Sequence, residues 1–412
     1  MLKHTPTTPS LRSLALAAWF GLGITPLFAQ QVPSVPLRTA TASVADPFTM
    51  IGGVREVAPG KVIVVDPRDR VAELIDLSSG TARKIGREGS GPGEYQFPGG
   101  VYPLPNNETL LVDPPQTRFL RIDASGTVVE TFTYPNGIGP AMRVRGTDAQ
   151  GHVYFEGASL AIPSGRPDQG IETPDSVPVM RWDRRSGKVD SLMMVKGPQM
   201  KVSASGEGNS RNFSVRQKPY AARDGWAVGP DGRVAVVRSA PYRVDTRSPS
   251  GSRTTGAVIS SRALPITQGD KEAYLKGLQA ERRMMSVSGD GGGDGRSSAG
   301  SAGPQPPPPS ADDYEWPATK PYFDPATVQM SPAGELWVER TRPAGDDVPV
   351  YDVFNVAGKL VRRVTFPVKT RLVGFGEGSV YVARTDEDDL QYLERYGDCG
   401  AHCDSRGVPL GR

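Results

Sequence analysis

Residues 84–101 read KIGREGSGPGEYQFPGGV, and this stretch decides the fold that the rest of the chain predicts. Its glycines permit positive φ angles and its two prolines lack an N–H donor, so neither a helix nor a long strand can run through it. Tyr95 and Phe97 are apolar rings in a segment that is otherwise polar. We therefore predict a turn-rich crossover between two small β-sheets, held in a defined structure by these rings. A phosphate-binding loop would need other residues after its glycines, or a following helix, and neither is present.

A tight turn followed by an apolar strand occurs six times along the chain. Examples are Pro59-Gly60 before residues 62–65 and Asp231-Gly232 before residues 234–237. Short turns of this kind between apolar runs are the strongest local signal for a β-hairpin. The turns are centred on residues 60, 107, 151, 232, 334 and 378, so three of the five intervals are 44 to 47 residues. That is about the length of a four-stranded propeller blade, and the two longer intervals contain insertions.

Residues 89–97, followed by Asp113 and by Arg118, resemble an NHL repeat, which has a glycine-rich lead, an aromatic anchor and a strand that ends in aspartate. The resemblance covers residues 84–126 and is degenerate elsewhere. The chain also resembles the six-bladed propellers of exported bacterial proteins. These resemblances imply a fold and a general binding role, and they imply no reaction.

The repeats predict an all-β fold, a six-bladed β-propeller of four-stranded antiparallel blades over residues 37–397. The sixth unit has only three strands and ends near Tyr396, whereas the strand-like residues 37–41 precede the first unit. We predict that this N-terminal segment closes the ring as the outer strand of the sixth blade. Without it the last blade would expose an unpaired edge.

Three insertions interrupt the blades, at residues 159–177, 196–219 and 267–313. The first two are polar and irregular. The third predicts a helix, because Thr267 can cap its first turn and an apolar stripe follows at Tyr274, Leu275, Leu278 and Met285. We expect this helix to pack on the rim of the propeller, the alternative being a helix that binds a partner protein. The end of this insertion, from residue 286, is rich in Gly, Ser and Pro and predicts a disordered linker.

Residues 1–29 have the features of a secretory signal peptide. Lys3 and Arg12 are followed by an apolar run of 11 residues, too short for a bilayer, which takes about 20. We expect the chain to be periplasmic or secreted, with no membrane span after cleavage. Removal of the signal lowers the 48 Lys and Arg residues to 46, against 45 Asp and Glu residues. So nearly neutral a chain is not expected to bind nucleic acid.

The two cysteines of the chain, Cys399 and Cys403, lie in a C-terminal tail, residues 398–412. The exported compartment favours a disulfide between them. A metal site with His402 would lack a clear fourth ligand, and haem attachment needs Cys-x-x-Cys-His, which is a different order. We predict a small disulfide loop, no cofactor and a monomeric chain.

Ligands of propellers usually approach the central channel, which is lined by the innermost strand of each blade. The strand before each tight turn is the predicted innermost one, and four arginines of these strands are the predicted ligand-binding residues: Arg55, Arg143, Arg145 and Arg371. If they converge at one mouth of the channel, they suit a carboxylate, sulfate or phosphate group. The alternative is that they pair with neighbouring acids or point to the rim.

Catalysis is the less favoured interpretation, and no catalytic residue or metal ligand is predicted. Propeller lactonases of similar shape hold calcium with several oxygen ligands, and only Glu56 is placed for that role. The related zinc enzymes use histidines, and after signal cleavage only His152 and His402 are left. We expect a binding or scaffold propeller for a protein, a saccharide or a small anionic ligand. The alternatives are a metal-dependent hydrolase or lactonase-like enzyme that uses the central channel, and a structural partner in an envelope assembly recruited through residues 267–313.

Overall fold

The computed structural model describes Met1 and residues 32–37, 39–139, 142–158, 173–205, 212–288 and 309–397. The chain divides into two compact units, Met1–Gln31 and Val32–Arg412, and every element named below belongs to the second. Several predicted features lie outside the described residues. They are the signal sequence beyond Met1, most of the first insertion, the linker at residues 289–308, and the tail with Cys399 and Cys403.

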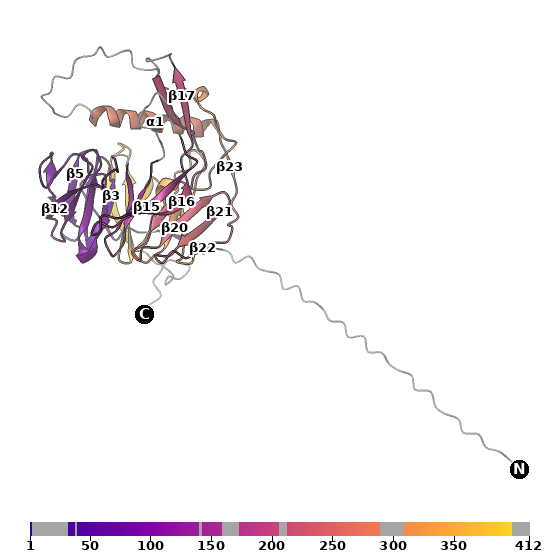
Figure 1. Cartoon of the computed structure of the whole chain (residues 1–412), viewed down its shortest axis with the longest axis horizontal. Coiled ribbons are helices and arrows are strands. Elements are labelled where there is room, and N and C mark those ends of the chain that lie inside the picture. The colour runs from indigo at the N-terminus through magenta and orange to yellow at the C-terminus, as the bar shows by residue number, and fades with distance from the viewer. Residues whose placement is uncertain are drawn as a thin grey trace. The chain divides into compact units, whose positions relative to one another are not determined.

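Six sheets follow one another along the second unit and form the blades drawn in Figure 1. Each has four antiparallel strands, and one of them has a fifth strand in addition. The first blade contains β3 (Gly53–Ala58), β4 (Lys61–Asp66), β5 (Val71–Asp76) and β6 (Thr81–Lys84). The second contains β9 (Gly100–Pro103), β10 (Thr109–Asp113), β11 (Arg118–Ile122) and β12 (Val128–Thr133). The third contains β13 (Arg143–Thr147), β14 (Val153–Glu156), β15 (Ser176–Trp182) and β16 (Val189–Lys196).

The other three blades repeat this plan. The fourth contains β19 (Gly225–Val228), β20 (Val234–Ser239), β21 (Tyr242–Arg247) and β22 (Arg253–Thr255). The fifth contains β25 (Gln329–Met330), β26 (Leu336–Glu339), β27 (Val350–Phe354) and β28 (Leu360–Thr365). The sixth contains β29 (Thr370–Gly376), β30 (Ser379–Thr385), β31 (Gln391–Gly397) and, from the N-terminal end of the unit, β2 (Ala42–Ser43).

The first strand of each blade lies in an inner ring. Strand β3 contacts β9, β9 contacts β13, β13 contacts β19, β19 contacts β25, and β29 contacts β3. The remaining step is made by Gln329 of β25, whose Nε2 donates to the carbonyl oxygen of Leu372 in β29 at 3.2 Å. The ring is therefore closed, and the predicted six-bladed propeller is confirmed.

The second strand of each blade is covered on both faces, which explains its continuous apolar sequence. In β4, Val64 packs in a core cluster with Tyr381 of the sixth blade, while Ile63 packs with Leu111 of the second. All four residues are at most 1% exposed. Each blade is thus stabilised by burial against both of its neighbours.

The N-terminal segment closes the ring, but a few residues later in the sequence than predicted. Strand β2 pairs with β31 as the outer strand of the sixth blade, and next to it the Thr41 N–H donates to the Arg395 carbonyl at 2.7 Å. The preceding β1 (Ser34–Pro36) lies parallel to β28 and adds a fifth strand to the fifth blade. Of the segment predicted as the closing strand, Leu37 and Ala40 instead pack into the core between the fifth and sixth blades.

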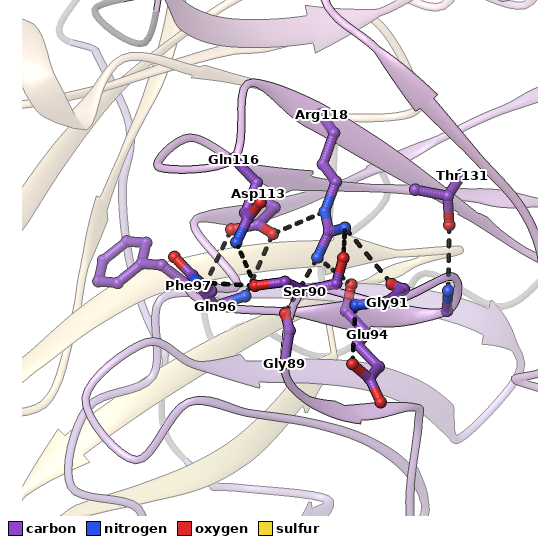
Figure 2. Close-up of polar contacts among 11 residues, drawn as sticks. Gly89, Ser90, Gly91, Glu94, Gln96, Phe97, Asp113, Gln116, Arg118 and Thr131 are labelled. Atoms are coloured by element: carbon purple, nitrogen blue, oxygen red, sulfur yellow. Dashed lines mark hydrogen bonds and ion pairs between the residues drawn. The ribbon is translucent and has the colours of Figure 1, made fainter. Parts of the chain in front are cut away.

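The crossover after the first blade is structured, as predicted, and Arg118 holds it (Figure 2). The Arg118 guanidinium donates to the carbonyl oxygens of Gly89, Ser90 and Glu94 at 3.1, 3.0 and 2.5 Å, and to Asp113 Oδ2 at 3.1 Å. The short strands β7 (Arg87–Glu88) and β8 (Glu94–Tyr95) pair within this loop. Because one buried cation binds several carbonyl oxygens of the loop, the loop has a fixed conformation in the folded protein.

The two aromatic rings of the crossover differ in their burial. Tyr95 is 1% exposed, and its hydroxyl donates to the Ile85 carbonyl at 3.0 Å and accepts from the Ala72 N–H at 2.9 Å. Phe97 is only partly buried, and its backbone N–H donates to Asp113 Oδ1 at 3.0 Å. Tyr95 is therefore the aromatic anchor of the loop.

The described parts of two insertions form a cap beside the blades, which we define as residues 199–205, 212–222, 264–288 and 309–320. It contains the hairpin β17 (Met200–Ser205) and β18 (Asn212–Gln217), the pair β23 (Leu264–Pro265) and β24 (Thr319–Lys320), and α1 (Gln268–Ser288). Figure 1 draws α1 and β17 on the same side of the blades. The hairpin is a correction, since its polar sequence was expected to be irregular. The predicted first insertion is also shorter at its end, because β15 already begins at Ser176.

The predicted helix is present, and its apolar face packs within the cap. The ring of Tyr274 in α1 contacts those of Tyr220, Tyr314 and Trp316 in tilted or edge-to-face arrangements, at centroid distances of 5.6 to 5.8 Å. At the start of α1, the Asp270 N–H donates to Thr267 Oγ1 at 3.3 Å and the Thr267 N–H donates to Asp270 Oδ2 at 2.8 Å, and this reciprocal pair caps the first turn. Asp270 also pairs with Lys320 of β24, and both side chains are at most 4% exposed. The ion pair holds the second insertion together, and Tyr220 of the first insertion joins it through the ring of Tyr274 and through a hydrogen bond from its hydroxyl to the Asp270 carbonyl at 2.9 Å.

Three short 3-10 turns complete the described structure: Pro105–Asn107, Ala311–Asp313 and Pro325–Thr327. Among the described residues, no helix is long and apolar enough to cross a membrane.

Candidate functional site

A cavity of about 290 Å³ opens where the inner strands of four successive blades begin. It is lined by residues at the starts of β9, β13 and β19 and by the turn before β25, among them Gly99, Arg143, Gly225 and Pro325. Lys196, Pro198 and Arg223, which flank the first segment of the cap in sequence, also line it. The cavity thus lies at one end of the inner ring, between the blades and the stems of the cap.

Four cationic side chains line this cavity: Arg143, Arg145, Lys196 and Arg223. Arg143 is exposed, and Lys196 and Arg223 are half-buried. In the part of the chain that the structure describes, the charged groups of these three make no hydrogen bond and no ion pair. They are therefore available to an anion.

Arg145 is built into the cavity wall. Its Nη2 donates to the carbonyl oxygens of Trp226 and Pro325, at 3.2 Å in both cases. Burial lowers the pKa of Arg145 below its ordinary value, because the charged guanidinium loses its hydration there. It links the third blade to the fourth and to the turn before the fifth.

The structure brings together two of the four predicted arginines, Arg143 and Arg145. Arg55 donates instead to Asn107 Oδ1 at 2.6 Å, on the hairpin turn of the second blade, and burial lowers its pKa to about 10. Arg371 donates to the carbonyl oxygen of Ile51 and to Gln391 Oε1, the latter at 3.0 Å. Neither of these two lines the cavity. Arg55 thus joins the first blade to the second, and Arg371 joins the sixth blade to the segment before β3, in both cases through oxygen atoms that carry no charge.

Two carboxylates also line the cavity, and they differ in their partners. Asp224 Oδ2 accepts from Arg238 Nη1 at 2.7 Å, and its Oδ1 accepts from the Ser239 N–H at 3.0 Å. Glu156 lies directly opposite Arg143 in the pairing of β13 with β14. Its carboxylate has no hydrogen bond or ion pair among the described residues. Among the described residues, the cavity therefore has three cationic side chains without a partner and one such carboxylate.

Sequence reasoning missed Lys196, Arg223 and Glu156. Arg223 stands two residues before an inner strand, and Lys196 ends the outer strand of the blade before it. The position of Arg223 near the site could have been predicted, because the stretches that lead into the inner strands all reach the same end of the ring.

Glu56, the one residue placed for calcium by its sequence position, serves the closure of the ring. Its Oε2 accepts from the Glu377 N–H at 2.8 Å, and its Oε1 accepts from the Tyr381 hydroxyl at 2.5 Å and the Gly60 N–H at 3.2 Å. Tyr381 and Glu377 belong to the sixth blade, so this carboxylate bonds the first blade to the last. Among the described residues, no three His, Cys, Asp or Glu side chains are grouped so that they could hold a metal ion.

We expect Glu56→Gln to lower the free energy of unfolding by about 2–4 kcal/mol, since an amide cannot accept at both of its ends and leaves buried donors unpaired. Urea unfolding followed by tryptophan fluorescence measures this change. Glu387→Gln is the matched control, because Glu387 is exposed and has no partner among the described residues. Equal unfolding midpoints for the two variants would contradict this role of Glu56.

His152 is a turn residue, as its sequence position indicates. Its Nδ1 lies 2.7 Å from Asp148 Oδ2, and the same oxygen accepts from the Tyr154 hydroxyl at 2.9 Å. These contacts fix the hairpin turn between β13 and β14. They lie outside the cavity lining.

No family model and no curated protein matches this sequence. In structure the chain is similar to a DUF4221 family member from Bacteroides vulgatus, with 10% identity over 88% of this chain and 95% of that one and a TM-score of 0.43. It is also similar to the calcium-binding protein regucalcin from Agrobacterium tumefaciens (11% identity, 89% and 97% covered, TM-score 0.40). A third is virginiamycin B lyase from Staphylococcus aureus (11% identity, 87% and 98% covered, TM-score 0.39). Likenesses this distant carry no argument about activity.

Proposed function

We propose that this chain is a binding propeller that holds a small ligand by an anionic group in the cavity at the end of the inner ring. The observation that carries the proposal is that Arg143, Lys196 and Arg223 line the cavity without partners among the described residues. Guanidinium and ammonium groups bind carboxylate, sulfate and phosphate through charge-assisted hydrogen bonds. A concave site with apolar walls and a few convergent charges is typical of a small-molecule site.

We also infer that residues 1–29 direct export to the periplasm or beyond and that the mature protein acts as a monomer. The signal-peptide pattern supports the first inference. We further assign the unit at residues 84–126 to the NHL type, because its glycine-rich lead and its Asp113–Arg118 pair hold the crossover together. A fractionation experiment with antibody detection tests export, since the mature chain should be found outside the cytoplasm.

Arg143→Ala and Arg223→Ala should each weaken ligand binding by about tenfold or more. A hydrogen bond to a charged group contributes about 1.5–3 kcal/mol, and each 1.4 kcal/mol is a factor of ten in affinity. Titration calorimetry with sulfate, phosphate and carboxylates with and without an amino group measures the effect. Lys61→Ala is the matched control, because Lys61 is 54% exposed on the first blade's hairpin and lies away from the cavity. Unchanged affinity in both arginine variants, or no binding of any probe to the wild-type chain, would overturn the proposal.

A further inference from the structure

Glu156 is the one feature of the cavity that binding of a simple anion does not use. It ends β14, is half-buried, and its carboxylate has no hydrogen bond or ion pair in the described structure. A partly buried carboxylate without a partner is unfavourable, and it would repel an anionic ligand that carried no other charge. The position of Glu156 in the cavity wall therefore indicates a ligand that carries a positive group.

Arg143 is the obvious internal partner for Glu156, and the structure does not use it. The two residues face each other in the antiparallel pair of β13 and β14, a position in which opposite charges usually interact. No ion pair joins them. Both side chains line the cavity, so a negative and a positive group stand side by side there, each without a partner.

The other charges of the cavity complete a dipolar arrangement around Arg145. The pKa of Arg145 is lowered chiefly by burial, while the negative charge of Glu156 raises it and the positive charge of Arg223 lowers it. Both charges therefore act on Arg145, and all three side chains line the cavity. Such a cavity has cationic side chains that suit a carboxylate, and in Glu156 an anionic side chain that suits an ammonium group.

Apolar side chains also contribute to the lining, next to the polar groups of Tyr102 and Asp224. Phe97, Val112, Met142, Val144 and Pro198 contribute to it, and Trp226 lies beside them at 1% exposure. These walls would cover a hydrocarbon or thioether side chain. The volume of about 290 Å³ suits a ligand of that modest size.

We infer that the ligand of this cavity is a zwitterion with an apolar side chain, of the kind that a free α-amino acid presents, with its carboxylate on Arg143 and Arg223 and its ammonium on Glu156. This inference rests on the proposed function and names the ligand class of the same site. The neighbouring charges of opposite sign, both unpartnered, are the observation that carries it.

Matched pairs of probes test the inference on the chain without its signal peptide. The amino acids are L-leucine, L-methionine and L-phenylalanine, and their counterparts without the amino group are 4-methylpentanoate, 4-(methylthio)butanoate and 3-phenylpropanoate. Titration calorimetry should show at least one amino acid binding at least about tenfold more tightly than its counterpart, because only the amino acid satisfies Glu156.

Glu156→Gln should weaken binding of that amino acid by about tenfold or more and leave the affinity for its counterpart equal or higher. The substitution removes no bond within the described structure, so its thermal midpoint should match that of the wild type. Glu387→Gln, far from the cavity lining, is the control and should change neither affinity.

The outcomes separate the two proposals. If the counterparts bind as tightly as the amino acids, or if Glu156→Gln leaves the preference intact, the zwitterion inference fails while the anion-binding function stands. If sulfate and phosphate bind and none of the amino acids does, the inference fails in the same way. If no probe binds, the proposed function fails with it.

Discussion

Deletion of residues 32–44 from the mature chain should lower the free energy of unfolding by about 5 kcal/mol or more, which is within the whole stability of a typical domain. The deletion removes β1 and β2 and so unpairs the outer edges of β28 and β31. It also removes Leu37, which packs in the core between the fifth and sixth blades. Urea unfolding should therefore give a strongly reduced midpoint, and size-exclusion chromatography should show aggregates formed through the open edges.

A shorter deletion, of residues 32–36, is the matched control. It removes only β1, which is the fifth strand of a blade that already has four, and it leaves ring closure by β2 intact. We expect it to cost about 1–2 kcal/mol, from the loss of a few edge hydrogen bonds. A synthetic peptide of residues 32–48 should raise the midpoint of the longer deletion when it is added in trans. If both deletions have the same midpoint as the full chain, closure of the ring by this segment is contradicted.

The number of blades could be predicted from the sequence because its signal is local. The turns at Gly60, Gly232 and Gly378 have φ values of 75°, 78° and 63°, a conformation that glycine adopts without strain. The apolar strand after each turn is buried on both faces, so it stands out by composition alone. This pattern of a tight turn and an apolar strand, repeated at intervals of about one blade, was enough to predict the fold.

The exact closing strand and the cap hairpin could not be predicted, because their structure depends on contacts far away in the chain. Residues 37–41 were predicted as a strand, yet Leu37 and Ala40 pack in the core between two blades. Strands β17 and β18 have a polar sequence and pair with each other. The spacing of apolar residues along the sequence predicts neither outcome.

The candidate site was predicted in part for a related reason. Inner strands can be recognised from their turns, which placed Arg143 and Arg145 correctly in the ring. The partners that occupy Arg55 and Arg371 lie 52 and 320 residues away in sequence. These distant oxygen atoms decide whether an arginine of an inner strand is free or links two blades. No local sequence pattern predicts where such oxygen atoms lie.

Arg118→Ala should lower the free energy of unfolding by about 3–5 kcal/mol, the range measured when one partner of a buried ion pair is removed. The side chain of Arg118 is 10% exposed and that of Asp113 is fully buried. The substitution leaves the Asp113 carboxylate without its cation and takes donors from the carbonyls of Gly89, Ser90 and Glu94. Equilibrium unfolding in urea measures the loss, and limited proteolysis should newly cleave the crossover loop.

Two further variants show whether the geometry of Arg118 or only its charge holds the loop. Arg118→Lys keeps the charge, but a single ammonium cannot reach all the oxygens that the planar guanidinium bonds, so we expect about half of the loss. Arg87→Ala removes an arginine of the same loop that is 81% exposed and pairs with Glu94, and it should cost less than about 0.5 kcal/mol. If Arg118→Ala were as stable as Arg87→Ala, the crossover would have to be held by Tyr95 alone. An Arg118→Lys variant with the stability of the wild type would mean that charge suffices and that the bonds drawn in Figure 2 to the loop carbonyls add little.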